Sequence, residues 1–296
     1  MNFKKIKTDF AVSLARFWVM LPLPIVLSFG CFLGRISNLI PNKRSKIAQR
    51  NIELCFPEKS KEQQKALLKS NLISTGQGFS EMLIAFWAKQ QKFMPDVVFH
   101  GLEHVDKALV KNKGCILLSC HLHPMELAVR AINIRLQRPG YMLARQHNNK
   151  VYEAHIDSAR RSHCEKTIDK KDLRTVIKSL KANRCLYYYP DQNFSYHCQY
   201  IDFFKQPAAT VVAIAKLAKS SQAEVVPWFV FRKNNKWHIT FLPALSYFHS
   251  DSIEHCLSKM NRLFEQQISK HPEQYLWVHR RFKNHPKGRN YLYKDI

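Results

Sequence analysis

The sequence has little cysteine and glycine, with eight of each among 296 residues. The cysteines are scattered and include no Cys-x-x-Cys pair, which excludes the disulfide framework of small secreted domains and predicts reduced, cytosol-facing thiols that mostly serve packing. No spacing typical of zinc ligands occurs, so we expect no metal site. Internal repeats, low-complexity tracts and linkers rich in Gly or Ser are also missing. This favours a single catalytic-type domain behind an N-terminal helical region.

Acidic residues are scarce as well. Lys and Arg number 47 against 22 Asp and Glu, a formal net charge of +25, and the 46% hydrophobic content excludes a disordered chain. Such a charge attracts polyanions, so the candidate partners are nucleic acid, an anionic membrane and an acidic protein. No helix-turn-helix, zinc-finger or RNP-like signature is present, which disfavours nucleic acid as the partner.

Residues 17–34 form an uncharged apolar run that is just long enough to span a membrane. Pro22 and Pro24 would kink a helix there, and Lys and Arg residues flank the run on both sides, so charge gives no orientation. We expect residues 1–42 to be a membrane anchor, either as a span or as a hairpin or interfacial helix on an anionic leaflet. The alternative is a buried core helix. Residues 43–296 would then form the catalytic domain.

The rest of the chain predicts an α/β fold. Residues 43–92 have helical spacing of apolar residues with a break at Pro57. After them, short apolar runs alternate with helix-like stretches, which indicates a central, mostly parallel sheet flanked by helices. Pro227 argues against a central position for its strand. The first predicted strand begins at residue 97. Further strands are predicted at 115–120, around 142, and at 185–189, 225–231 and 237–242. Helices are expected at 210–219 and 252–270.

The segment from His121 to Glu126 carries the candidate chemistry. A base at the end of a strand, followed by a carboxylate about one turn later, lets the carboxylate hold one ring nitrogen while the other takes a substrate proton. This arrangement fits acyl transfer without a protein nucleophile. His123 is a competing candidate for the base.

The sequence resembles the bacterial lipid A late acyltransferases, the lauroyl and myristoyl transferases that act after Kdo addition, from near Arg16 to Gly288. The residues that carry the resemblance are 50–57, His121-x4-Glu126, Arg145 to Tyr152, Arg160 ahead of 169–173, Tyr189-Pro-Asp191-Gln192, 203–210 and 272–283. His-x4-acid alone is shared by glycerolipid acyltransferases generally, whereas its combination with 272–283 is highly specific. Two departures are the loop Gln192-Asn193-Phe194, where relatives commonly have a second Asp and a Gly, and the missing proline after Arg145.

The resemblance implies a fold like that of glycerolipid acyltransferases and a reaction without cofactor or metal. A fatty acyl chain would pass from acyl carrier protein to the hydroxyl of a 3-hydroxyacyl chain on a Kdo-bearing lipid A precursor. His121 would be the general base, Glu126 its orienting partner, and Arg160 and Asp191 further catalytic residues; Arg160 or a backbone amide would bind the oxyanion. Arginines near a phosphorylated glycolipid suit anion binding. The expected substrate-binding residues are Arg145, Asn149, Arg280, Arg281 and Lys283.

The resemblance also implies a place and partners. The catalytic domain would face the cytoplasm at the bacterial inner membrane, with acyl carrier protein, the Kdo-bearing precursor and membrane lipid as partners. An acceptor of another kind, a lysophospholipid or a different glycolipid, is the alternative, and the 272–283 block argues against it. Some of the many aromatic residues would line an acyl tunnel, while most belong to the core.

Overall fold

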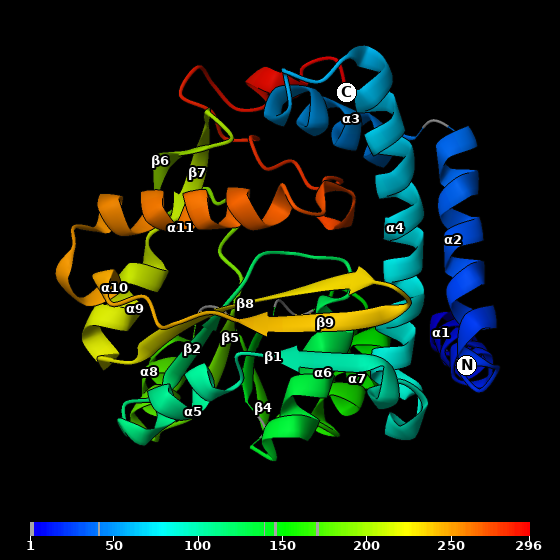
Figure 1. Ribbon diagram of the computed structural model, residues 1–296. Helices are drawn as coiled ribbons and strands as arrows, with labels where there is room; N and C mark the ends of the chain where they lie inside the picture. The colour runs from blue at the N-terminus through cyan, green and yellow to red at the C-terminus, as the bar shows by residue number, and fades with distance from the viewer. Residues whose placement is uncertain (1–2, 41, 139, 145–146, 170–171) are drawn as a thin grey trace.

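The computed structural model describes residues 3–40, 42–138, 140–144, 147–169 and 172–296 (Figure 1). The helices are α1 (Phe3–Trp18), α2 (Leu23–Leu39), α3 (Lys43–Cys55), α4 (Lys61–Trp87), α5 (Glu103–Val110), α6 (Met125–Leu136), α7 (Lys150–Arg161), α8 (Leu173–Lys181), α9 (Ala213–Ser221), α10 (Tyr247–Ser250) and α11 (Ile253–Ile268). The strands are β1 (Val97–His100), β2 (Cys115–Leu118), β3 (Tyr141–Ala144), β4 (Lys166–Asp169), β5 (Cys185–Tyr188), β6 (Cys198–Phe203), β7 (Gln206–Val211), β8 (Glu224–Lys233) and β9 (Lys236–Phe241).

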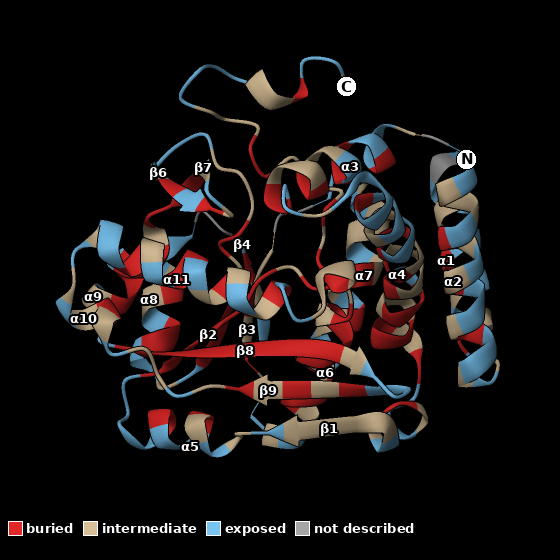
Figure 2. Ribbon diagram, turned by 45° about the horizontal axis from the view of Figure 1, so that its top comes forward, coloured by how far each residue is buried: buried red, intermediate tan, exposed pale blue. Residues whose placement is uncertain are grey.

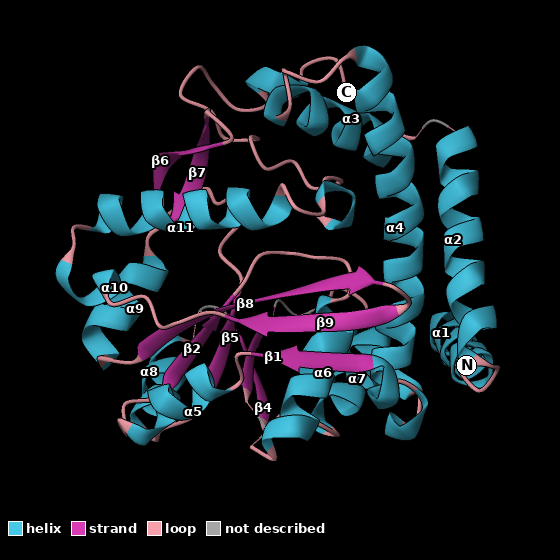
Figure 3. Ribbon diagram, viewed as in Figure 1, coloured by secondary structure: helices cyan, strands magenta, loops and turns pink. Residues whose placement is uncertain are grey.

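The main sheet has the strand order β1-β9-β8-β2-β5-β3-β4. Strands β8, β2, β5, β3 and β4 are parallel, whereas β9 runs antiparallel to β8 and β1 pairs parallel with β9. Strands β6 and β7 form a separate antiparallel pair. The predicted α/β fold with a mostly parallel central sheet flanked by helices is thus confirmed (Figure 3).

The centre of the sheet is also the centre of the core. All residues of β2 and β5 are buried. The first eight residues of β8 are buried as well, and Figure 2 shows this strand in red along most of its length. Continuous apolar runs of this kind are typical of parallel strands covered on both faces. Our expectation for Pro227 is wrong, because β8 lies between β2 and β9. The proline lacks only the amide donor, and its carbonyl still accepts a hydrogen bond from the Leu242 amide at 2.9 Å.

Helix α2 packs closely against α4 through glycines. A Cβ atom on Gly34 would lie 2.4 Å from the Leu72 carbonyl oxygen, and one on Gly76 would lie 2.2 Å from the Gly30 carbonyl oxygen. Small residues four apart let two helix backbones approach in this way. The N-terminal helices are therefore joined to the rest of the protein by a close interface, and Figure 1 shows α2 lying along α4.

The outer surface of the N-terminal helices is rich in exposed apolar side chains. Phe3, Ile6, Phe10, Leu14 and Phe17 are all exposed on α1, and their spacing of three or four residues places them on one face. In the part of the chain that the structure describes, no single helix is long and apolar enough to cross a bilayer; α2 and α3 meet that test together, with a bend of 84° between them. The membrane anchor and its boundary at residue 42 stay predictions.

Candidate active site

The pairing of β2 with β5 creates the site. The two strands are adjacent and parallel, with Leu118 opposite Tyr188, so the residues that follow them meet at the same edge of the sheet. The Ser119 amide donates to the Tyr188 carbonyl at 3.1 Å and continues this pairing beyond the strands. His121 follows β2 and Asp191 follows β5, and this edge brings them together.

Asp191 holds His121 at two points. Its Oδ1 lies 2.6 Å from His121 Nδ1, and its Oδ2 accepts from the His121 amide at 2.9 Å and from the Tyr275 hydroxyl at 3.0 Å. Burial alone would raise the pKa of Asp191, but His121 and these hydrogen bonds outweigh it and lower the pKa to about 2. The carboxylate is therefore ionised and only accepts, so Nδ1 of His121 carries the proton. The lone pair of a neutral imidazole is then on Nε2.

Glu126 does not take the place we expected for it. Its Oε1 accepts from Arg160 Nε at 2.6 Å, while the carboxylate at His121 Nδ1 comes from Asp191. The reason is topological: Glu126 lies in the first turn of α6 and contacts α7, whereas the strand pairing delivers Asp191 to the histidine. Burial opposes the charge of Arg160, and Glu126 outweighs it, so the pKa of Arg160 is raised.

Tyr189 lies beside His121, and the charges of both pairs act on its phenol. Its ring centroid is 5.4 Å from that of His121, and the pKa of its phenol is raised by burial and by the charges of Glu126 and Asp191. Its buried hydroxyl has no hydrogen-bond partner among the described residues. The four predicted catalytic residues form two pairs, His121–Asp191 and Glu126–Arg160.

Gln192 also contacts His121, and the sequence did not predict a role for it. Its Nε2 lies 3.1 Å from His121 Nε2 and donates to the ring lone pair. A hydroxyl that gives its proton to His121 must take this position from the amide. Gln192 follows Asp191 in one of the segments that carry the family resemblance. Its place there was the sequence signal that could have identified it.

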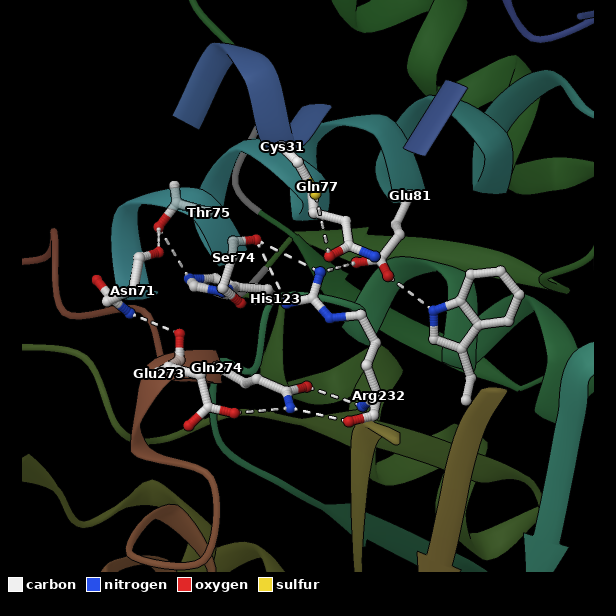
Figure 4. A network of polar contacts seen from close by, with 11 residues as sticks. Cys31, Asn71, Ser74, Thr75, Gln77, Glu81, His123, Arg232, Glu273 and Gln274 are labelled. Carbon is white, nitrogen blue, oxygen red and sulfur yellow. Dashed lines mark hydrogen bonds and ion pairs between the residues drawn. The ribbon is translucent and has the colours of Figure 1, made fainter. Parts of the chain in front are cut away.

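His123, the competing base, faces the other way. Its Nδ1 lies 2.7 Å from the Ser74 hydroxyl and its Nε2 3.1 Å from the Thr75 hydroxyl, both on α4 (Figure 4). Burial and the nearby Arg232 charge lower the pKa of His123 well below its usual value. Both ring nitrogens are occupied by the protein, so the geometry favours His121 as the base.

The C-terminal block at residues 272–283 holds the loop after β2. The Leu276 amide donates to the His121 carbonyl at 3.0 Å, and the His123 amide donates to the Gln274 carbonyl at 2.9 Å. Together with the hydrogen bond from the Tyr275 hydroxyl to Asp191, these bonds fix the loop at the sheet edge. Tyr275 was also missed at the sequence level, although it lies in the specific block.

The predicted anion-binding residues mostly serve the fold. Arg281, predicted to bind substrate, is 2% exposed and donates to the Ala209 carbonyl at 2.8 Å and to Thr210 Oγ1 at 2.7 Å, so its guanidinium is buried and bonded within the fold. Arg280 donates to the Ile296 carbonyl at 2.7 Å. Asn149 caps α7. Lys283 is partly exposed, and Arg145 lies outside the described residues.

Two cavities have linings that do not include His121. One of about 600 Å³ lies between α2 and the β8–β9 hairpin, and one of about 1020 Å³ lies beside α7, β3 and β4; His121 lines neither. Within the described ranges, no group of three or more His, Cys, Asp or Glu side chains could hold a metal ion.

The fold and the site define an α/β enzyme with a histidine oriented by a buried carboxylate. The family model described as bacterial lipid A biosynthesis acyltransferase matches residues 4–284, and the chain belongs to this family. It is therefore an O-acyltransferase of lipid A biosynthesis.

Individual relatives match along most of the chain. The lipid A biosynthesis lauroyltransferase of Escherichia coli (strain K12) is 31% identical over 91% of this chain and 89% of its own. The palmitoleoyltransferase of the same strain is 28% identical over 97% and 94%. The solved 1-acyl-sn-glycerophosphate acyltransferase from Thermotoga maritima covers 80% of this chain and 98% of its own, with 12% identity and a TM-score of 0.39, which is too distant to inform function.

Proposed function

We propose that the protein transfers a fatty acyl chain from acyl carrier protein to the hydroxyl of a 3-hydroxyacyl chain on a Kdo-bearing lipid A precursor. The observation that carries this proposal is the His121–Asp191 pair. Asp191 holds Nδ1 of the His121 ring, and Nε2 contacts the side-chain amide of Gln192, which an acceptor hydroxyl could replace. The family supports the acceptor class. The +25 charge suits an acidic carrier and a phosphorylated lipid.

The reaction follows from the protonation states. His121 Nε2 takes the proton of the acceptor hydroxyl as its oxygen attacks the thioester carbon, and the ionised Asp191 stabilises the resulting imidazolium. The proton then passes to the departing carrier thiolate, which leaves an ester and a thiol. Positioned general-base catalysis of this kind contributes about 10²–10⁴-fold.

Cys120, which precedes the histidine, is unsuited to act as a nucleophile. The residue is fully buried, and burial together with the Asp191 charge raises the pKa of its thiol well above the usual value. A thiol that stays protonated is a poor nucleophile. Direct attack by the acceptor hydroxyl therefore suits this site better than an acyl-enzyme.

Arg160 is the side-chain candidate for the thioester oxyanion. Glu126 accepts a hydrogen bond from its Nε and fixes the guanidinium, which leaves the terminal N–H groups to bind a substrate oxygen. In this assignment Glu126 is a positioning residue for Arg160. A backbone amide is the alternative donor.

The experiment is an acyl-transfer assay read by mass spectrometry. Purified protein is supplied with acyl carrier protein charged with saturated chains of different length and with a tetra- or penta-acylated Kdo-bearing precursor. We expect the precursor to gain the mass of one acyl chain. Acylation of a lysophospholipid, with none of the glycolipid, would instead assign the alternative acceptor.

We also propose that the N-terminal region attaches the enzyme to the cytoplasmic face of the inner membrane. The apolar face of α1 supports this, because Phe10 is 71% and Phe17 64% exposed. Basic residues beside such a face favour an anionic leaflet. Phe10→Asp/Phe17→Asp should abolish flotation with anionic vesicles. The matched control is Val110→Asp on α5, where an apolar residue of 79% exposure is changed and flotation should persist.

A further inference from the structure

The cavity of about 600 Å³ beside α2 lies outside the proposed catalytic site. Its lining is apolar in one part and mainly cationic in another, where four Lys and Arg side chains outnumber the carboxylate of Asp96. Leu23, Leu27, Cys31 and Arg35 line it from one face of α2, since they are spaced by four residues. The lining therefore changes from apolar at the start of the helix to cationic at Arg35. Its volume lies within the range of ligand-binding pockets.

The opposite wall is the tip of the β8–β9 hairpin. Asn234 and Asn235 have φ values of 51° and 58°, which is the geometry of a two-residue type I′ turn. This turn places Lys233 directly opposite Lys236 across the two strands. Like charges in that position destabilise a hairpin, and neither lysine forms an ion pair within the described part of the chain. An anion bound between them would relieve the repulsion.

Arg232 also lines the cavity, but its charge is already paired. Its Nη1 lies 3.2 Å from Glu81 Oε2, and its Nη2 donates to the Ser74 hydroxyl (Figure 4). Glu81 is fully buried and also accepts from Trp237 Nε1 at 2.7 Å. Arg232 is thus already paired, whereas the lysines and Arg35 are exposed cations at the same cavity.

The exposed side chains of α2 beside the cavity indicate what kind of anion could bind there. Helix α2 borders the cavity, and its outer side exposes Ile25, Phe29 and Phe32. A cavity that begins at an apolar surface and ends in cations is complementary to an amphiphile with an anionic head. Because His121 does not line it, this ligand would be bound without reacting.

We propose that this cavity binds one anionic phospholipid of the surrounding leaflet, with its phosphate at Lys233, Lys236 and Arg35 and the start of a chain along Leu23 and Leu27. The proposal rests on the proposed membrane location of the enzyme. It gives the N-terminal helix pair a specific lipid contact in addition to its general apolar surface.

The test is native mass spectrometry of the full-length protein released from a neutral detergent that contains phosphatidylglycerol. The wild type should retain one phosphatidylglycerol molecule and should not retain phosphatidylcholine. Lys233→Ala/Lys236→Ala should weaken retention about thirtyfold. The matched control, Lys178→Ala/Lys181→Ala, removes two exposed lysines of α8 and should retain the lipid like the wild type. Equal loss in both variants would overturn the proposal.

A second variant separates volume from charge. Ser28 is an exposed residue of α2 that lines the cavity, so Ser28→Trp fills the space and leaves every charge in place. We expect it to lose the bound lipid while vesicle flotation persists. Retention of the lipid by Ser28→Trp would show attraction to surface lysines only, and the cavity assignment would be wrong.

Competition identifies the source of the phosphate. Excess inorganic phosphate should not displace the phospholipid, because it lacks the chain, and excess Kdo-bearing precursor should not displace it either. Displacement by the precursor would assign the cavity to the acceptor and overturn our choice of ligand. Lipid retention is measured without turnover, so failure of the acyl-transfer assay would contradict the proposed function and leave this result readable.

Discussion

Two histidines separated only by Leu122 occupy opposite sides of the loop after β2. His121 faces the sheet edge and meets the carboxylate of Asp191, whereas His123 faces α4 and meets two hydroxyls. The difference shows that the partner, and not the residue type, decides what a histidine can do. A carboxylate stabilises an imidazolium, and the Arg232 charge opposes one.

The largest expected difference between the two sides is catalytic. His121→Ala removes the proposed base and should lower the acyl-transfer rate about 10³-fold. His123→Ala should keep the rate within about twofold and lower stability by about 2 kcal/mol, because two hydrogen bonds to α4 are lost. The measurement is the initial rate in the mass-spectrometric assay, with thermal unfolding of the same samples.

The reverse pattern would assign the base to His123. A His121→Ala enzyme with the rate of the wild type would show that the proton is taken elsewhere, whatever the behaviour of the second variant.

The next largest effect concerns the carboxylate on the His121 side. Asp191→Asn preserves the shape and removes the charge that stabilises the imidazolium, so we expect a loss of about 10²-fold in kcat with little change in KM. Asp157→Asn is the matched control, because Asp157 forms an exposed pair with Arg161. Equal rates for Asp191→Asn and the control would remove Asp191 from the catalytic role.

On the α4 side, a change of charge should affect stability and not turnover. Glu81→Gln leaves the Arg232 guanidinium without its carboxylate and should lower the free energy of unfolding by about 2 kcal/mol. We expect kcat to stay within about twofold. A loss of kcat comparable to that of Asp191→Asn would show that the two sides of the loop are coupled in catalysis.

Much of the fold could be predicted because buried parallel strands have a strong local pattern. The apolar runs at 115–120, 185–189 and 225–231 are the strands β2, β5 and β8. The prediction for Pro227 was wrong because the proline lies opposite Leu118, the last residue of β2, and just before the pairing of β8 with β9 begins at Trp228, so the missing donor falls at the ends of both ladders. Strands β4, β6 and β7 were missed. Strands β4 and β6 have mixed or exposed patterns, and β7 is largely buried but consists mostly of small residues and a proline.

The site could be predicted only as a set of residues. Sequence proximity suggested Glu126 as the partner of His121, but strand pairing brings Asp191 there from 70 residues away. The same limit applies to Arg281, since a cation within a basic cluster looks exposed until its carbonyl acceptors are known. Local patterns identify candidates, and the long-range contacts assign their partners.

The smallest predicted effect is the pH dependence of stability, which also separates the two sides. In the folded chain the pKa of His123 is lowered by burial and by Arg232, the charged group that faces it, so the unfolded chain binds the additional proton below about pH 6.5. Stability therefore falls as the pH decreases, by about 1.4 kcal/mol at pH 5.5 from this residue. Asp191, with its pKa lowered to about 2, contributes stability that is lost only between about pH 4 and pH 2.

Unfolding curves of His123→Gln and the wild type, recorded between about pH 7.5 and about pH 5.5, measure the contribution of His123. A wild-type slope that persists unchanged in the variant would assign the acid sensitivity to other buried histidines, of which His163, with its pKa lowered to about 3 by burial and by Arg130 and Arg160, is the next to test.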